Sequence, residues 1–271
     1  MCTTCGCGSD EVRVTSLGST DTPRPEHDHD HPHVHPHDHP HDYPQTIDIR
    51  EAVLGKNDDL AEGNRAWLAA RRMAAVNLMS SPGAGKTSLL ERSIRELPAG
   101  TVQVIEGDQE TTFDAERIRS AGAEAVQVNT GAGCHLDATM VRRALESLSP
   151  QRDALVFIEN VGNLVCPALF DLGERARVVV ISVTEGDDKP LKYPHMFAAA
   201  DLVVVNKTDL LPYVDFDVDR CRAAATQLNP DAEFVLLSVR DGTNVDKWYD
   251  WLQALCTPVF PVLDTPKSPG A

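Results

Sequence analysis

Short runs of apolar residues alternate with longer stretches of helical periodicity over most of this 271-residue chain. A short continuous apolar run predicts a strand buried on both faces, whereas apolar residues three and four positions apart predict a helix with one buried stripe. Together they predict an α/β fold whose mostly parallel sheet is covered by helices on both faces. The predicted strands are Ala75–Met79, Thr101–Glu106, Ala125–Val128, Ala154–Glu159, Val178–Val183, Leu202–Asn206 and Glu233–Leu237. The predicted helices follow Lys86, Thr112, Leu136, Pro190, Phe216 and Val245.

The part of the chain before the first strand has two different patterns. From Ile47 to about Arg72 the periodicity predicts helix, and Gly55 and Gly63 are places where it could divide into two helices. Before that, Pro, His, Asp and Thr dominate, and no sustained hydrophobic periodicity occurs. We therefore predict a disordered or metal-ordered tail over residues 1–45 and a single globular domain over 46–271.

Composition narrows the class of protein. The net charge of -16 argues against nucleic acid as a partner, because non-specific binding to it needs a basic face. No apolar run reaches the roughly 20 residues of a membrane span, and the N-terminus lacks the pattern of a secretory signal. These features predict a cytoplasmic protein without a membrane partner. Its seven cysteines are then expected to be metal ligands or core residues, since cytosolic thiols stay reduced.

The segment NLMSSPGAGKTSLL leads from a predicted strand through a glycine-rich loop into a predicted helix. Its end fits the phosphate-binding pattern G-x-x-x-x-G-K-[ST], in which backbone N–H groups curl around phosphates, the lysine contacts the β- and γ-phosphates and the hydroxyl reaches Mg²⁺. The first glycine of that pattern is replaced by Ser80, so the turn there could be shaped differently, and a chance match stays open. The predicted nucleotide-binding residues of this loop are Gly83, Ala84, Gly85, Lys86, Thr87 and Ser88.

A second nucleotide motif follows the strand Leu202–Asn206. Asn206-Lys207-Thr208-Asp209 has the N-K-x-D pattern of a guanine-reading loop, although four residues alone could be an ordinary polar turn. The Asp209 carboxylate would accept hydrogen bonds from N1–H and the 2-amino group of guanine, which adenine does not present in that arrangement. Asn206 and Lys207 would brace the loop and cover the base. After the last strand, Ser238 and Val239 are predicted to contact the base as well.

A triphosphatase also needs groups that respond to the γ-phosphate. Glu159 ends a predicted strand, and Gly162 stands three residues on, where its N–H could bond the γ-phosphate. Asp108 follows another strand and could orient water or bind Mg²⁺, although a solvated loop carboxylate is the simpler alternative. No glutamine or arginine stands where hydrolysis is usually assisted, so we expect slow intrinsic hydrolysis. The predicted catalytic residues are Lys86, Asp108, Glu159 and Gly162, and the predicted magnesium ligands are Thr87, Asp108 and Glu159.

The N-terminal tail carries two kinds of candidate metal ligand. Cys2, Cys5 and Cys7 form a C-x-x-C-x-C cluster whose thiolates suit Ni²⁺ or Zn²⁺, unless they are incidental thiols of a flexible terminus. A histidine-rich tract follows, which predicts weak, exchangeable storage of Ni²⁺, Zn²⁺ or Cu²⁺ that is released below about pH 6; a solvated linker is the alternative. The histidines of this tract are His27, His29, His31, His33, His35, His37, His39 and His41.

An inner metal site is predicted at the ends of neighbouring strands. Cys134 and His135 are adjacent at the predicted start of a helix, where the helix dipole would favour a thiolate, and Cys166 lies four residues beyond Gly162. Each alone would more simply be a core residue, but together they could make a three-ligand site with an open position. A ligand at Cys166 would move with the loop that senses the γ-phosphate. Cys221 and Cys256 are predicted core residues.

Taken together, CTTCGC, the histidine tract, SSPGAGKTSLL, EGDQETTFDAERI, GAGCHLDA, IENVGNLVCPA and NKTD resemble the HypB family of GTPases, over nearly the whole chain. The resemblance implies a P-loop GTPase of the SIMIBI class with GTP/GDP and Mg²⁺, acting in the delivery of nickel to [NiFe]-hydrogenase. It further implies a homodimer formed with nucleotide or metal, high-affinity Ni²⁺ at the N-terminal cysteines and an interfacial Ni²⁺ or Zn²⁺ site at Cys134, His135 and Cys166. The implied partners are a HypA-type nickel chaperone and the hydrogenase large-subunit precursor.

Three other functions remain open at this point. A urease-type nickel GTPase would have a similar core, but it is expected to carry Cys-Pro-His, whereas Ala168 follows Cys166-Pro167 here. A nickel or zinc storage protein with an uncoupled GTPase would bind metal regardless of nucleotide. A small-molecule P-loop kinase is disfavoured by the NKTD motif and by the absence of a recognisable acceptor pocket.

Overall fold

The computed structural model describes residues 45–108, 113–131, 133–148 and 150–256. The chain divides into two compact units, Met1–Ala52 and Val53–Ala271. Of the first, only the beginning of helix α1 (Gln45–Ala69) is described, so the predicted boundary between residues 45 and 46 stays a prediction. Among the described residues, no helix is both long and apolar enough to cross a bilayer.

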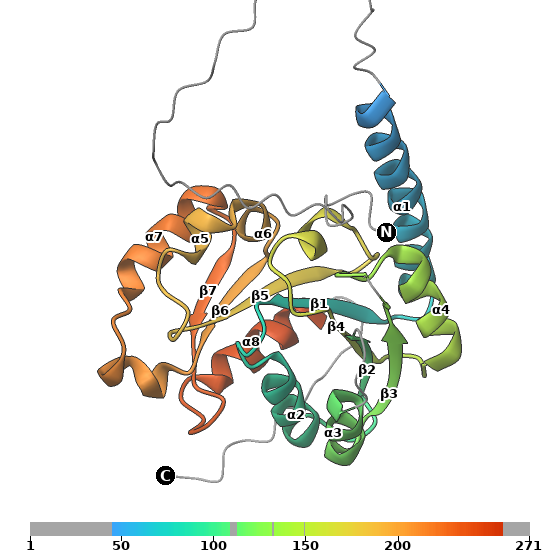
Figure 1. Cartoon of the computed structure of the whole chain (residues 1–271). Helices are drawn as coiled ribbons and strands as arrows, with labels where there is room; N and C mark the ends of the chain where they lie inside the picture. The colour runs from blue at the N-terminus through green and yellow to red at the C-terminus, as the bar shows by residue number, and fades with distance from the viewer. Residues whose placement is uncertain (1–44, 109–112, 132, 149, 257–271) are drawn as a thin grey trace, which may run out of the picture. The chain divides into compact units, whose positions relative to one another are not determined.

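The second unit is built on a seven-stranded parallel sheet in the order β3-β2-β4-β1-β5-β6-β7 (Figure 1). All seven predicted strands are confirmed, with ends that differ by at most two residues. Their bounds are β1 Ala74–Ser80, β2 Val102–Asp108, β3 Glu124–Asn129, β4 Leu155–Glu159, β5 Ala176–Ser182, β6 Leu202–Asn206 and β7 Glu233–Leu236. The four central strands β4, β1, β5 and β6 are almost fully buried, which explains their continuous apolar sequence.

Helices cover both faces of this sheet, as predicted. One face packs against α2 (Lys86–Glu96), α3 (Phe113–Ala121) and α8 (Val245–Cys256), with Trp248 as the largest fully buried side chain. The other face packs against α4 (Ala138–Leu148) and the part of α1 from Val53 onward, and further along the sheet against α6 (Pro194–Ala198) and α7 (Val218–Leu228). The fold is therefore the predicted doubly covered α/β sheet.

Three details of the helices differ from the predictions. The region after Pro190 holds two short helices, α5 (Lys189–Lys192) and α6, in place of one. Two short 3-10 helices were not predicted: η1 (Cys166–Leu169) begins at the candidate metal ligand Cys166, and η2 (Thr208–Tyr213) begins within the N-K-x-D motif. Each is only one or two turns long, so it carries too little periodicity to be recognised in sequence.

The suggested division of the first helix at Gly55 and Gly63 is wrong, because α1 runs without interruption from Gln45 to Ala69. Two buried asparagines hold it in place. The Asn57 amide donates to Asp171 O and accepts from Ala138 N, and the Asn64 amide donates to the carbonyls of Ala138 and Leu172. Such tertiary contacts outweigh the cost of about 1 kcal/mol that a glycine imposes inside a helix.

Candidate functional site

The phosphate-binding loop joins the end of β1 to the start of α2, at the carboxyl edge of the sheet. Gly83 and Gly85 both have positive φ, 78° and 104°, which side chains rarely adopt. At Gly85 a Cβ atom would also lie 2.3 Å from the amide nitrogen of Asn206. Glycine is therefore required at the position where the loop passes closest to the second nucleotide motif.

The departure at Ser80 has a local explanation. Ser80 is the last residue of β1 and is fully buried, and its hydroxyl accepts a hydrogen bond from Lys86 Nζ at 2.8 Å. The serine thus holds the lysine ammonium under the loop. Burial lowers the pKa of Lys86, an effect that the nearby Glu159 carboxylate opposes. An anion bound above the loop would complete the charge balance of this buried lysine.

Thr87 and Glu159 meet on the floor of the same cavity. The Thr87 hydroxyl donates to Glu159 Oε1 at 2.7 Å, while Oε2 is buried without a hydrogen-bond partner among the described residues. Burial raises the pKa of Glu159, opposed by Lys86 and by the Thr87 hydrogen bond. A buried, unpartnered carboxylate oxygen beside a threonine hydroxyl fits the oxygen ligands that Mg²⁺ prefers. The donor set therefore suits magnesium.

The cavity above these groups has a volume of about 540 Å³. Its lining brings together the predicted phosphate loop, Asp108 at the end of β2, Glu159 and Gly162, although they are far apart in sequence. Arg117 of α3 also lines it and is held by ion pairs to Glu91 and Asp114 at 2.9 Å. The individual catalytic and magnesium roles of these side chains stay predictions, but their assembly at one cavity follows the expectation for parallel sheets.

Glu106 is a residue of this region that the sequence analysis did not single out. It is 2% exposed and lies opposite Glu159 in the register of β2 and β4, with Oε2 unpartnered among the described residues. Burial, reinforced by Glu159 and Asp108, raises the pKa of Glu106 to about 8. A glutamate inside the buried strand β2, two residues before the candidate ligand Asp108, was the available signal.

We expect Glu106→Gln to raise the thermal unfolding midpoint of the magnesium- and nucleotide-free protein more at pH 8 than at pH 5. Since the folded-state pKa is raised above 4.5, the stability tied to protonated Glu106 is present at low pH and lost as the pH rises towards about 8. The isosteric amide cannot ionise and avoids that loss, which amounts to at most a few kcal/mol. Differential scanning calorimetry across this range measures it. An equal shift at every pH, or the same pattern in the exposed control Glu233→Gln, would contradict the assignment.

The candidate base site lies beside the phosphate cavity, in a second cavity of about 260 Å³. Asn206 at the end of β6 donates to Ala84 O at 3.0 Å and accepts from the N–H groups of Lys207 and Val239. Asn206 therefore ties three loops together, as the predicted bracing role requires. These contacts place the N-K-x-D loop directly against the phosphate loop.

Two further contacts shape the base site. Lys207, with a positive φ of 61°, reaches over the phosphate loop and donates from Nζ to Gly83 O at 2.7 Å. The Ser238 hydroxyl donates to Asp209 Oδ1 at 2.7 Å, which fixes the orientation of that carboxylate. Gly85, Ser88, Asn206, Lys207, Asp209 and Val239 all line this cavity. Ser238 holds Asp209 and is not among the residues that line this cavity, and its predicted contact with the base stays a prediction.

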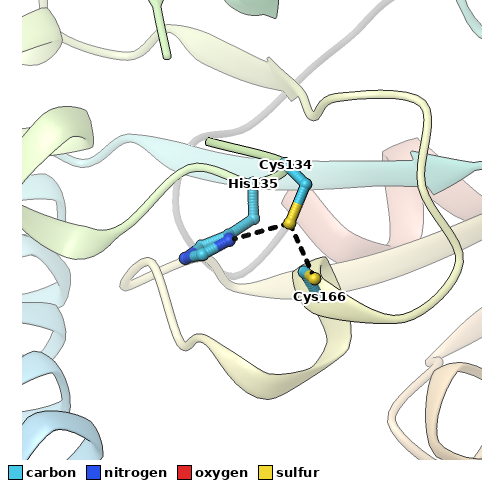
Figure 2. A group of neighbouring side chains, drawn as sticks. All are labelled: Cys134, His135 and Cys166. Atoms are coloured by element: carbon cyan, nitrogen blue, oxygen red, sulfur yellow. Dashed lines mark hydrogen bonds between the residues drawn. The ribbon is translucent and has the colours of Figure 1, made fainter. Parts of the chain in front are cut away.

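The predicted inner metal ligands come together from two segments (Figure 2). Cys134 and His135 follow β3, and Cys166 begins η1. The two sulfur atoms are 2.8 Å apart, and Cys134 Sγ is 3.7 Å from His135 Nδ1. One ligand atom from each residue lies within 4.8 Å of the others, close enough for a single ion. Two thiols and an imidazole suit Zn²⁺ or Ni²⁺.

The surroundings of this cluster restrict its imidazole. The His135 ring stacks on Phe170, with the ring centroids 4.0 Å apart. Burial lowers the pKa of His135, and Asp137 opposes this more weakly, so the ring favours the neutral form that binds metal. Placing Cys134 and His135 at the start of a helix is wrong, because α4 begins only at Ala138. The helix dipole falls off within the first turn and gives no reason for a thiolate at Cys134.

The remaining cysteines and the histidines of the N-terminal tract divide into two groups. Cys221 and Cys256 are 0% and 1% exposed, which confirms that they are core residues, and burial raises their thiol pKa values to about 12 and about 11. The cluster Cys2, Cys5 and Cys7 and the tract from His27 to His41 lie outside the described residues. Their metal-binding roles stay predictions.

Comparison with known proteins agrees with this geometry. Residues 74–236 match the family described as CobW/HypB/UreG, nucleotide-binding domain. Hydrogenase maturation factor HypB of Escherichia coli K12 is 55% identical over 208 residues, which cover 76% of this chain and 72% of that protein. The corresponding factor of Azotobacter vinelandii is 56% identical over 206 residues, 76% of this chain and 68% of that protein.

Two solved structures are also similar to this chain. The crystal structure of HypB from Archaeoglobus fulgidus has a TM-score of 0.69 at 42% identity and covers 75% of this chain and 100% of that one. HypB from Helicobacter pylori, solved in complex with nickel, has a TM-score of 0.70 at 35% identity and covers 80% and 100%. From its fold, its nucleotide motifs and these relatives, the chain belongs to the HypB family of hydrogenase maturation factors.

Proposed function

We propose that this protein is a GTP-hydrolysing nickel metallochaperone that helps to insert nickel into [NiFe]-hydrogenase. The observation that carries the proposal is the spacing of Gly162 and Cys166 on one short loop. Gly162 lines the phosphate cavity and packs on Pro82 of the phosphate loop, where a Cβ would lie only 3.2 Å from the proline ring. Cys166, four residues later, belongs to the metal cluster. A change at the γ-phosphate therefore has a short path to a metal ligand.

In this proposal the chain's own residues perform the hydrolytic step by positioning and charge. Lys86 contacts the β- and γ-phosphates, the Gly162 N–H bonds the γ-phosphate, and Asp108 orients the attacking water. Thr87 and Glu159 would hold magnesium, which would supply positive charge beside the phosphates. Asp209 selects guanine. Since Arg117 is held by two carboxylates, we expect intrinsic hydrolysis to be slow.

Nickel is the cargo of the inner site. GTP binding organises a homodimer and the cluster of Cys134, His135 and Cys166, and hydrolysis loosens Cys166 so that nickel passes on. The site could hold Zn²⁺ when nickel is absent. The N-terminal thiolates would bind Ni²⁺ tightly and the histidine tract would store it. The proposed partners, all cytoplasmic, are a HypA-type nickel chaperone and the hydrogenase large-subunit precursor.

The test is nickel transfer from the protein to a chelator in GTP, GDP, a non-hydrolysable GTP analogue and ATP. The full chain is used with Cys2, Cys5 and Cys7 changed to alanine, and a weak competing ligand first removes nickel from the histidine tract. We expect the rate to depend on the guanine nucleotide and to ignore ATP. Cys166→Ala should abolish that dependence, whereas the matched core variant Cys221→Ala should retain it.

Equal rates with all four nucleotides would contradict the proposal and favour a metal store with an uncoupled GTPase. A urease-type role is distinguished from the hydrogenase role by the enzyme that receives nickel. Only a hydrogenase chaperone restores nickel insertion into the hydrogenase large subunit. The geometry favours the hydrogenase role, because the third ligand is His135 from another loop, while Ala168 occupies the position where Cys-Pro-His would place histidine.

A further inference from the structure

Asn163 links the two segments that carry the inner metal ligands. Its Nδ2 donates to the carbonyl oxygen of Cys134 at 3.4 Å, and its Oδ1 accepts from the N–H of Val165 at 2.8 Å. One side chain therefore contacts the backbone of one ligand, Cys134, and the residue directly before another, Cys166. It also follows directly on Gly162, which packs on the phosphate loop.

The two ends of this linkage are held differently. Asn160, 1% exposed, accepts from the N–H of Leu136 and donates to Asn77 Oδ1 of β1, so the segment after His135 is fixed to the central sheet. Asn163 is half-buried in the loop after the sheet ends. A shift of Gly162 would then move Asn163 relative to a Cys134 segment that stays in place.

The lengths of the two Asn163 hydrogen bonds fit this difference. The bond to Val165 is short and closes a local turn, so it travels with the loop. The bond to Cys134, at 3.4 Å, is at the long limit for an N–H···O bond, where a few tenths of an ångström decide whether it forms. This second bond is the part of the linkage that a small loop movement can make or break.

We propose that the Asn163 side chain couples nucleotide state to metal affinity through its hydrogen bond to the Cys134 carbonyl, acting as a positioning residue and not as a ligand. The inference rests on the proposed function, because it needs a protein whose nickel affinity depends on nucleotide. It adds a second route beside the covalent one through Cys166. Both thiol ligands, not Cys166 alone, then respond to the γ-phosphate.

The test measures nickel affinity of the inner site with GDP and with a non-hydrolysable GTP analogue, in the same background without Cys2, Cys5 and Cys7. The ratio of the two dissociation constants is the coupling factor, expected within about 5–150-fold for the unaltered site. Asn163→Asp keeps the acceptor for Val165 N–H but cannot donate to Cys134. Asn163→Ser is uncharged and too short to reach it. Both should lower the factor several-fold, to the part that the route through Cys166 carries, while nucleotide affinity is retained.

Asn129→Asp is the matched control. Asn129 ends β3 and closes the same kind of turn, with Oδ1 accepting from Gly131 N–H at 2.7 Å, and the substitution introduces the same charge. It should leave the coupling factor unchanged. Because linkage is reciprocal, nickel should alter nucleotide affinity by the full factor in the control and by the same reduced factor in both Asn163 variants. A fold defect would not produce that pattern.

The failures of the two proposals are distinguishable. A coupling factor of one in the unaltered protein would refute the proposed function, and with it the coupling assigned to Asn163. A factor that keeps the value of the unaltered protein in both Asn163→Asp and Asn163→Ser would leave the proposed function standing and overturn the role of Asn163. Loss in the aspartate variant alone would trace the effect to added charge and would also overturn it.

Discussion

Replacing Lys86 with alanine is expected to lower the turnover number for GTP hydrolysis by about 10²–10³-fold, the usual loss when one preorganised charge contact to the transition state is removed. The Nζ atom is buried beneath the phosphate loop and held by Ser80, so no solvent ion can take its place with the same geometry. Phosphate-release assays at saturating GTP measure the effect. The exposed Lys247→Ala is the control, because it removes the same group from α8, away from the cavity lining.

The same substitution should not destabilise the nucleotide-free fold. Burial lowers the pKa of Lys86, which means that the folded protein without nucleotide disfavours the ammonium. Removing it should leave the thermal unfolding midpoint unchanged or raise it, a trade of stability for activity that is common in functional sites. A variant that hydrolyses GTP normally would refute the predicted role, and one that melts early would show that Lys86 instead supports the fold.

The sequence predicted the elements that depend on local pattern. Apolar runs located the strands most clearly where they are buried on both faces, whereas the edge strands β3 and β7 are only partly buried. The three consecutive valines of Leu202–Asn206 leave little choice of structure. The phosphate loop and N-K-x-D loop could be predicted because their backbone geometry demands particular residues. Gly85 illustrates this, since both its φ and the neighbouring Asn206 amide exclude a side chain.

The features that sequence did not predict depend on contacts between distant residues. The continuity of α1 through two glycines depends on Asn57 and Asn64 bonding to residues more than 70 positions away. The raised pKa of Glu106 depends first on its burial and then on its register opposite Glu159, and register cannot be read from one strand. The Asn163 linkage likewise exists only because β3 and β4 bring their following loops together around the intervening β2.

The strand order explains why the candidate nucleotide site and the candidate metal site share one edge. From β1 the chain continues to β2, β3 and β4 on one side of β1, and it then crosses to β5 on the other side. The carboxyl ends of β1 and β4 therefore border the crevice in which such sheets bind ligands. β4 supplies Glu159 to the phosphate cavity, and the loop that continues from it supplies Cys166 to the metal cluster. One connection therefore serves both sites.

Changing Asp209 to asparagine is expected to weaken GTP binding by about 10²–10⁴-fold, since two hydrogen bonds to a charged acceptor are each worth about 1.5–3 kcal/mol. In the proposed base site the carboxylate would accept from guanine N1–H and the 2-amino group, whereas an amide would turn an N–H towards that amino group. Xanthine carries an oxygen there, so the same variant should bind xanthosine triphosphate more tightly than the unaltered protein does. Titration with fluorescent analogues of both nucleotides measures the two dissociation constants and so the change of preference from GTP to xanthosine triphosphate.

Two controls separate base recognition from general damage at this loop. Asp209→Ala removes the acceptor without supplying a donor, so it should lose GTP affinity and gain none for xanthosine triphosphate. The exposed Asp215→Asn makes the same chemical change just beyond η2 and should alter neither affinity. Because Ser238 donates to Asp209 Oδ1, Ser238→Ala should weaken GTP binding less than Asp209→Asn, as it frees the carboxylate without removing it. If Asp209→Asn kept its preference for guanine, the base would have to bind outside the cavity that Asp209 lines, and the link between this loop and guanine specificity would fail.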